Sequence, residues 1–170
     1  MRVLVIFTVP KAAKRPGLTQ ALGPTETMSN TQYAFLKKSD VPSRSLLQAS
    51  IDALGYDLQL YPDLDLLHDS GFSPCVLHGT QDVGFELYSQ DSTEVTNGDE
   101  NLTSVAGQTD FCIAMVWGGN MKDLACVMVV SCALAKDFAA VVSYEGQHIQ
   151  SVDDLLTQTP AIIQHAMGRP

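Results

Sequence analysis

Acidic side chains and one histidine are concentrated in residues 57–69, DLQLYPDLDLLHD, which contain four aspartates and no lysine or arginine. Carboxylates and imidazole at such spacing are the groups that bind metal ions or transfer protons. A calcium loop also needs a glycine at its turn and a closing glutamate, and this stretch has neither. Because leucines alternate with polar residues at the period of a half-buried strand, we expect the aspartates on its solvent face and predict no metal site.

Two further features have residue types that suit ligand binding or catalysis. Gly118, Gly119 and Asn120 precede an apolar helical segment, where glycine N–H groups can hold a ligand at a helix N-terminus. The same glycines also let a strand turn tightly into a helix, which is the interpretation we favour. His78 and His148 have the chemistry of general bases, but no hydrolase or phosphate-binding motif accompanies them. The sequence therefore favours a non-enzyme, and we assign no catalytic residue, metal or cofactor.

The net charge of −9 hides a steep gradient along the chain. Residues 1–50 contain seven basic and two acidic side chains, whereas residues 51–170 contain three basic and seventeen acidic ones. Solubility explains any one exposed acid, but a field of this size repels nucleic acid and anionic membranes and attracts cationic proteins. We therefore expect a basic protein as the partner, with neither nucleic acid nor membrane.

The acids between residues 57 and 100 are the predicted partner-binding residues: Asp63, Asp65, Asp69, Asp82, Glu86, Asp91, Glu94, Asp99 and Glu100. The stretch SGFSPCVLHGTQDVGFELY predicts a β-hairpin, with Phe72 and Phe85 packed under the sheet and its two acids outside. Residues 90–109 are rich in turn formers and acids, so we predict a mobile loop of about twenty residues at the rim of the binding face.

Apolar periodicity predicts an α+β fold, with a single mixed or antiparallel sheet and about three helices packed on it. Helices are expected over residues 43–55, 120–136 and 151–168, each starting at a Ser or Asn of N-cap type. Pro160 should kink or break the last of them. The apolar run FCIAMVWGG predicts a central strand that is buried on both faces.

Residues 28–170 are predicted to form this single domain, with residues 1–27 as an extension or peripheral segment and translation starting at Met1 or Met28. The alternative is that residues 3–9 add a strand at one sheet edge. The four cysteines lack the two-residue spacing of zinc knuckles and redox motifs, so we expect reduced, buried thiols. The first apolar run precedes basic residues rather than a cleavage site, and none is long enough to span a membrane, so we expect a cytoplasmic protein.

In length, acidity, lack of a catalytic motif and α+β pattern, residues 28–170 resemble the small acidic immunity proteins that bacteria pair with secreted antibacterial toxins. The resemblance assigns no role to single residues. It implies a protein-binding inhibitor whose acidic face docks on a basic partner, such as the active site of a toxin. The alternative is a small-ligand-binding domain or enzyme with a pocket beside the Gly118, Gly119 and Asn120 turn, lined by groups such as His148 or Glu145. A third hypothesis is a homo-oligomer that associates through the last helix at Leu155, Leu156, Ile162 and Ile163.

Overall fold

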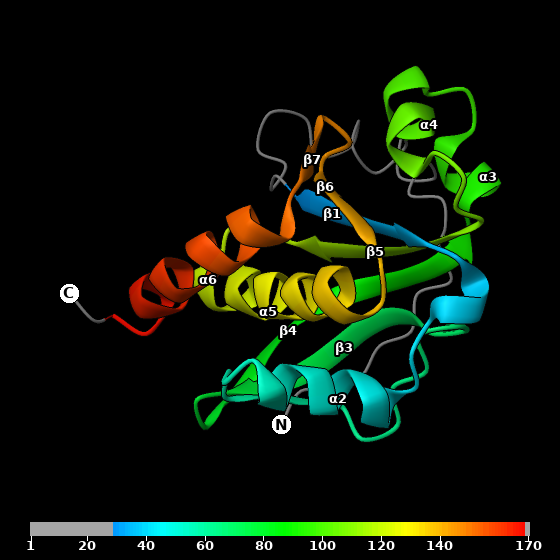
Figure 1. Cartoon of the computed structure of the whole chain (residues 1–170). Helices are drawn as coiled ribbons and strands as arrows, with labels where there is room; N and C mark the ends of the chain where they lie inside the picture. The colour runs from blue at the N-terminus through cyan, green and yellow to red at the C-terminus, as the bar shows by residue number, and fades with distance from the viewer. Residues whose placement is uncertain (1–28, 169–170) are drawn as a thin grey trace, which may run out of the picture.

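Seven antiparallel strands form one sheet in the computed structural model, which describes residues 29–168 (Figure 1). The strand order is β2-β3-β4-β5-β1-β6-β7, so the predicted α+β fold with one sheet is confirmed. The strands are β1 (Asn30–Leu36), β2 (Leu58–Leu60), β3 (Ser70–Leu77), β4 (Thr80–Asp91), β5 (Phe111–Trp117), β6 (Val141–Tyr144) and β7 (His148–Gln150). A 3-10 turn, η3 (Lys38–Asp40), follows β1.

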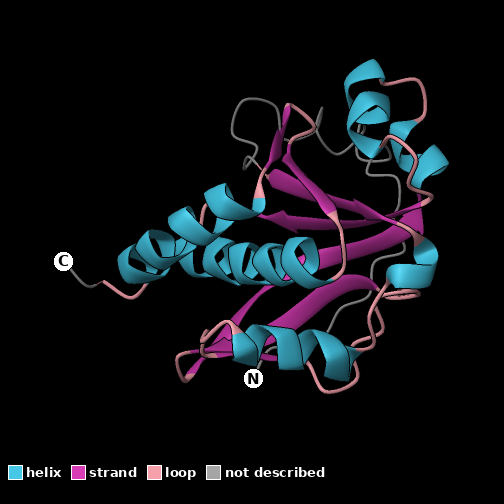
Figure 2. Cartoon of the chain, viewed as in Figure 1, coloured by secondary structure: helices cyan, strands magenta, loops and turns pink. Residues whose placement is uncertain are grey.

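Three helices of ten or more residues cover one face of the sheet, which we call the long-helix face (Figures 1 and 2). They are α2 (Arg44–Ala53), α5 (Met121–Asp137) and α6 (Val152–Ala166). Each begins at a residue that the sequence predicted, whose side-chain oxygen accepts a backbone N–H of the first turn: Ser43, Asn120 and Ser151. Pro160 lies inside α6, and the helix continues through it.

The main core lies between the sheet and these three helices. Residues 125–135 of α5 are each at most 9% exposed, so this helix is buried nearly all round. β5 is the middle strand, and its Ile113 and Met115 are fully buried against the helices. The predicted central strand is therefore confirmed.

α2 also closes one edge of the sheet. Gln48 Nε2 donates to the carbonyl oxygen of Leu58 at 2.8 Å, and Gln48 Oε1 accepts from the N–H of Leu60 at 2.9 Å. Arg44 donates to the carbonyl oxygens of Leu60 and Tyr61. These side chains satisfy backbone groups that would otherwise pair with another strand, so β2 is a protected edge.

Two short helices, α3 (Ser92–Thr96) and α4 (Glu100–Ala106), cover part of the opposite face, which we call the short-helix face. Leu102 and Val105 of α4 pack on Phe35 and Cys112 of the sheet in a separate apolar cluster. Asp99 caps α4, since its Oδ1 accepts the N–H of Leu102 at 3.0 Å. The prediction of a mobile loop over residues 90–109 is therefore wrong, because apolar residues at helical spacing anchor the segment to the sheet.

The strand predicted around residues 57–69 is shorter than its alternation suggested. β2 ends at Leu60, and residues 61–69 form turns. The expected sidedness still holds, because Asp63 and Asp65 are exposed while Leu64 and Leu66 are buried in the main core.

The β3–β4 hairpin is confirmed, but its two phenylalanines lie on opposite faces. Phe85 pairs with Ser73 and is 3% exposed in the main core. Phe72 pairs with Glu86 one position along, and adjacent positions of a strand face opposite ways, so Phe72 lies half-buried on the short-helix face. The predictions for residues 1–27, including a strand over residues 3–9, fall outside the described residues.

Candidate functional site

Seven of the nine predicted partner-binding acids lie toward one end of the sheet, where β4 ends and α3 and α4 follow (Figure 1). Ser89 Oγ donates to the carbonyl oxygen of Leu66 at 2.7 Å, which holds the 61–69 loop beside the last residues of β4. We call this set the acidic end: Asp63, Asp65, Asp69, Asp91, Glu94, Asp99 and Glu100.

The other two predicted acids do not join the acidic end. Asp82 lies near the start of β4, and the nine residues that separate it from Asp91 along the strand correspond to roughly 30 Å. Glu86 lies in the middle of β4 on the short-helix face, half-buried, and accepts a hydrogen bond from the Tyr88 hydroxyl. A continuous acidic face over the whole predicted set does not form, because the twelve-residue length of β4 separates Asp82 from the acidic end.

Several acids of this region also have structural roles. His68 Nδ1 lies 2.9 Å from Asp65 Oδ2, and this hydrogen bond, with one from the N–H of Leu67, lowers the pKa of the Asp65 carboxyl. Asp69 Oδ2 accepts the N–H of Asp65 at 2.8 Å. The loop is thus held partly by its own carboxylates, whereas Asp63 is exposed and available to a partner.

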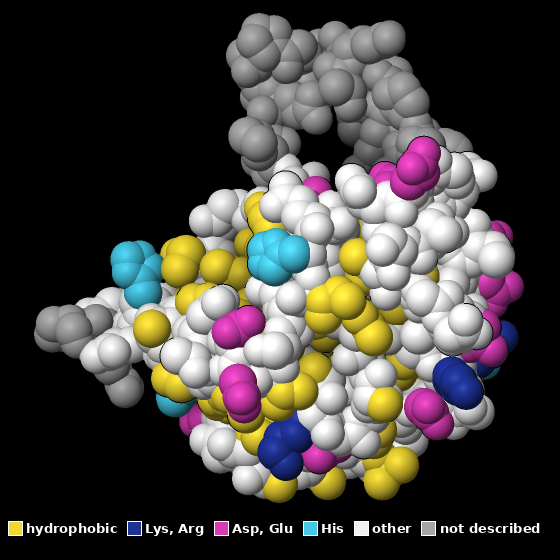
Figure 3. Space-filling model, turned by 45° about the horizontal axis from the view of Figure 1, so that its top comes forward, with side chains coloured by type: hydrophobic (Ala, Val, Ile, Leu, Met, Phe, Trp, Pro, Cys, Tyr) yellow, Lys and Arg dark blue, Asp and Glu magenta, His cyan; other side chains and the backbone are white. Residues whose placement is uncertain are grey.

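The acidic end has few cations beside it. Lys38 donates its N–H to Asp110 Oδ1 at 2.7 Å, and its ammonium group lies 5.6 Å from the centre of the Phe111 ring. The space-filling view shows acidic side chains spaced along the right-hand edge, with Lys or Arg side chains beside some of them (Figure 3). The five basic residues within 29–168 cannot neutralise the 18 acidic ones.

Tyr33 on β1 has a raised pKa, mainly because it is buried. Burial is the main cause that raises the pKa of Tyr33 to about 12, and the charges of Cys112, Glu145 and Asp99 raise it further. The tyrosine therefore stays protonated at neutral pH.

A pocket of about 500 Å³ lies beside the Gly118, Gly119 and Asn120 turn, between the sheet and helices α5 and α6. The alternative hypothesis required a pocket at this place. His148 lines it, as expected, whereas Glu145 is not part of its wall.

Hydrogen bonds between residues that are far apart in the sequence form the floor of this pocket. The Tyr144 hydroxyl donates to Asn30 Oδ1 at 2.7 Å, and Asn30 Nδ2 donates to the carbonyl oxygen of Gly118 at 3.2 Å. Gln32 Nε2 donates to Gln150 Oε1 at 2.8 Å. The side chains are thus held in place before any ligand arrives.

The backbone conformation of the turn does not require glycine at position 118 or 119. Neither Gly118 nor Gly119 has a left-handed φ, and a Cβ added at either would meet nothing within 4 Å. Their φ angles therefore give the tight-turn interpretation no support, and the absence of side chains leaves the rim of the pocket open.

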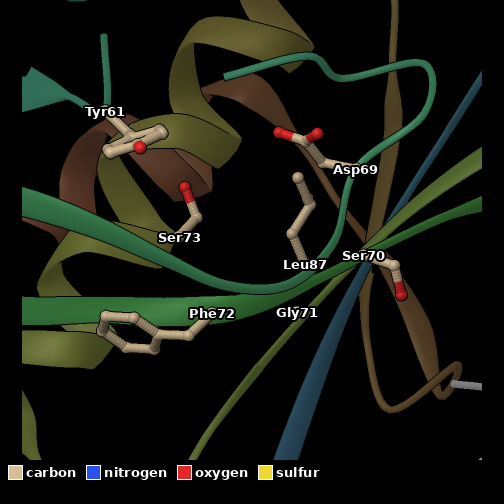
Figure 4. A pocket seen from close by; sticks show the side chains of 7 residues that line it. All are labelled: Tyr61, Asp69, Ser70, Gly71, Phe72, Ser73 and Leu87. Carbon is tan, nitrogen blue, oxygen red and sulfur yellow. The ribbon is translucent and has the colours of Figure 1, made fainter. Parts of the chain in front are cut away.

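A second, much smaller cavity of about 20 Å³ lies between β3 and the 61–69 loop. Figure 4 shows Tyr61, Asp69 and Ser73 on one side of β3 and Phe72 on the other. Ser73 Oγ is buried and has no hydrogen-bond partner within residues 29–168. This volume has room for one water molecule, so the cavity suits a buried water rather than an organic ligand.

The remaining predicted groups lie apart from one another. His78 Nδ1 is 3.9 Å from Asp57 Oδ2, and neither residue lines the pocket beside Gly118. All four cysteines are free and buried, as expected. Cys132 Sγ contacts Thr159 Oγ1 at 3.2 Å, and burial raises the pKa of this thiol, so it is not a reactive thiolate.

The apolar face of the last helix is already used within the chain. Leu155 is fully buried, and Leu156, Ile162 and Ile163 pack against the same main core. Leu155 is therefore unavailable to a second copy of the chain, whereas Leu156, Ile162 and Ile163 are partly exposed, and the oligomer hypothesis stays a prediction.

Comparisons with models of protein families, with curated proteins and with solved structures gave no match to this chain. Within residues 29–168, no group of three or more His, Cys, Asp or Glu side chains is arranged to hold a metal ion. No helix in this part of the chain is long and apolar enough to cross a membrane. Function must therefore be argued from the acidic end and the pocket themselves.

Proposed function

We propose that this chain is a protein-binding inhibitor of the immunity type, which docks its acidic end on a cationic partner such as a toxin. The observation that carries the proposal is the charge balance, since residues 29–168 contain 18 acidic and five basic side chains. An excess of this size destabilises a fold by self-repulsion and is expected where the field serves binding.

The acidic end offers both parts of a protein-binding surface. Asp63, Asp91 and Glu94 are exposed and can steer a cationic partner, which speeds association. Tyr61 and Leu67 are half-buried in the 61–69 loop, which also contains Asp63. They supply apolar area from which binding can remove water.

The test uses the protein encoded by the neighbouring gene, because toxin and immunity genes are paired. We expect the neighbouring gene product to arrest bacterial growth when it is expressed alone. Coexpression of the present chain should neutralise it. Between purified proteins, the association rate should fall roughly tenfold from low to high salt, because salt screens steering.

Matched double variants locate the interface. Asp91→Asn with Glu94→Gln removes two charges at the start of α3, and Asp153→Asn with Asp154→Asn removes two at the start of α6. Only the first pair should slow association, while both should change thermal stability slightly and equally. Absence of binding to the neighbouring gene product overturns the immunity assignment, and equal effects of the two pairs overturn the acidic end as the interface.

A further inference from the structure

The pocket beside the Gly118, Gly119 and Asn120 turn has the size of a site for a small organic molecule. Its volume is about 500 Å³, and such sites span roughly 300 to 1,000 Å³. It lies between the sheet and helices α5 and α6, away from the 61–69 loop and from α3 and α4. A ligand here would use none of the residues of the acidic end.

The lining of this pocket favours an uncharged ligand. No Lys, Arg, Asp or Glu side chain is among its lining residues. A charge buried without a counter-charge is costly, and the excess of acids elsewhere on the molecule repels anions further. The N-terminus of α5 does not offer an anion site either. Asn120 Oδ1 already accepts the N–H of Lys122, and the negative charge of Asp123 lies in the first turn of the helix.

Two carboxamides on the pocket floor each leave one polar atom without a hydrogen bond to the residues that the structure describes. Gln32 is 1% exposed, and its Nε2 donates to Gln150 Oε1 at 2.8 Å and to Ser131 Oγ at 3.4 Å. These bonds use the amino group of Gln32 and the carbonyl oxygen of Gln150. Within residues 29–168, no further hydrogen bond uses the oxygen of Gln32 or the amino group of Gln150, so these groups remain as an acceptor and a donor. A ligand edge with an N–H next to a C=O is complementary to this pair.

Aromatic and apolar side chains line the rest of the pocket. On the sheet, Trp117 and Tyr144 lie beside Asn30 and Gln32, with ring centroids 6.0 Å apart and ring planes tilted by 46°. Met121, Leu124 and Met128 of α5 line the same space. Thioether side chains adapt to the shape of a ligand, and aromatic rings favour a planar one. Larger side chains have free space at Gly118 and Gly119, so a substitution at this rim can narrow the pocket.

We propose that this pocket binds an uncharged, planar organic molecule that presents an amide-type edge, such as a lactam, a primary aromatic amide or a nucleobase. The amide edge pairs with the Gln32 oxygen and the Gln150 amino group. The ring lies against Trp117 and the methionines of α5.

The test compares neutral and anionic probes that share one ring: benzamide with benzoate, and nicotinamide with nicotinate. Methyl-labelled methionine reports binding in NMR spectra, because Met121 and Met128 line the pocket while Met167 at the end of α6 does not. At millimolar concentration the amides should shift the signals of Met121 and Met128 and leave Met167 unchanged. The carboxylates should bind at least roughly tenfold more weakly.

Three variants make the proposal refutable. Gly118→Leu should abolish the shifts without unfolding the chain, because its Cβ has free space. Gln150→Glu should weaken amide binding, whereas Gln147→Ala, on the exposed β6–β7 turn outside the pocket, should not change it. The proposal is overturned if the amides shift neither methionine, if benzoate binds as well as benzamide, or if Gly118→Leu binds like the unmodified chain.

Discussion

The two faces of the sheet are stabilised in different ways. On the long-helix face, α2, α5 and α6 bury a continuous core in which Leu134 and Leu155 are fully inaccessible to solvent. On the short-helix face, the seven-residue helix α4 covers a small cluster, and its Leu102 and Val105 are each 8% exposed. The first face therefore determines the stability of the fold, and the second supports the segment that presents Glu94 and Glu100 at the surface.

This difference indicates where the molecule can change without unfolding. Local opening costs least where few apolar contacts hold a segment, and the α3–α4 segment is such a place. A partner that binds the acidic end would act on the less stable face, while the core under α5 keeps its shape. The pocket lies on the long-helix face, so its walls are more rigid.

The largest expected effect is that of Leu134→Ala on the long-helix face. Leu134 is fully buried in α5 between the sheet and its neighbouring helices, where a long packed helix cannot move to fill a cavity. We expect a loss of about 2 to 5 kcal/mol in the free energy of unfolding. Chemical denaturation followed by circular dichroism measures it, and a loss below about 1 kcal/mol would contradict the described core.

Leu102→Ala on the short-helix face should cost less, about 1 to 3 kcal/mol, because a short surface helix can shift toward the sheet. Leu102 still packs closely, since a Cβ on Gly146 would lie 2.6 Å from its Cδ2. Hydrogen exchange should become faster in α3 and α4 before it changes in α5. Leu46→Ala, at a leucine that is 58% exposed, serves as the control and should have almost no effect.

The same contrast explains how far the sequence predicts the fold. The helices of the long-helix face have N-caps and several turns of apolar residues, and β5 is a run of seven residues without a charge. Such long, regular patterns identify an element from local sequence alone. α4 has only two turns, and its signal, Asp99 followed by Leu102 and Val105, is concealed among turn formers.

The candidate sites are less predictable, because contacts between distant residues form them. Gln32 and Gln150 are 118 residues apart in the chain, and Asn30 and Gly118 are 88 apart, so no local pattern shows that they share a pocket. The acids were recognisable by type, but their grouping depends on the twelve-residue length of β4, which separates Asp82 from the acidic end. The register of the sheet brings the pocket residues together, and the length of β4 determines which acids are grouped.

The smallest expected effect tests whether Asp99 supports the short-helix face or only adds charge to it. Its Oδ1 accepts the N–H of Leu102, so Asp99→Ala should lower the free energy of unfolding by about 1 kcal/mol, while Glu100→Ala should change it by less than about 0.5 kcal/mol. Asp99→Asn keeps the cap and removes the charge, so it should preserve stability and slow only the association with a cationic partner.

The cap and Leu102 stabilise the same helix, so Asp99→Ala combined with Leu102→Ala should cost less than the sum of the two single changes. If the costs add fully in denaturant titrations, α4 does not open as one unit, and the short-helix face is more rigid than its sparse packing implies.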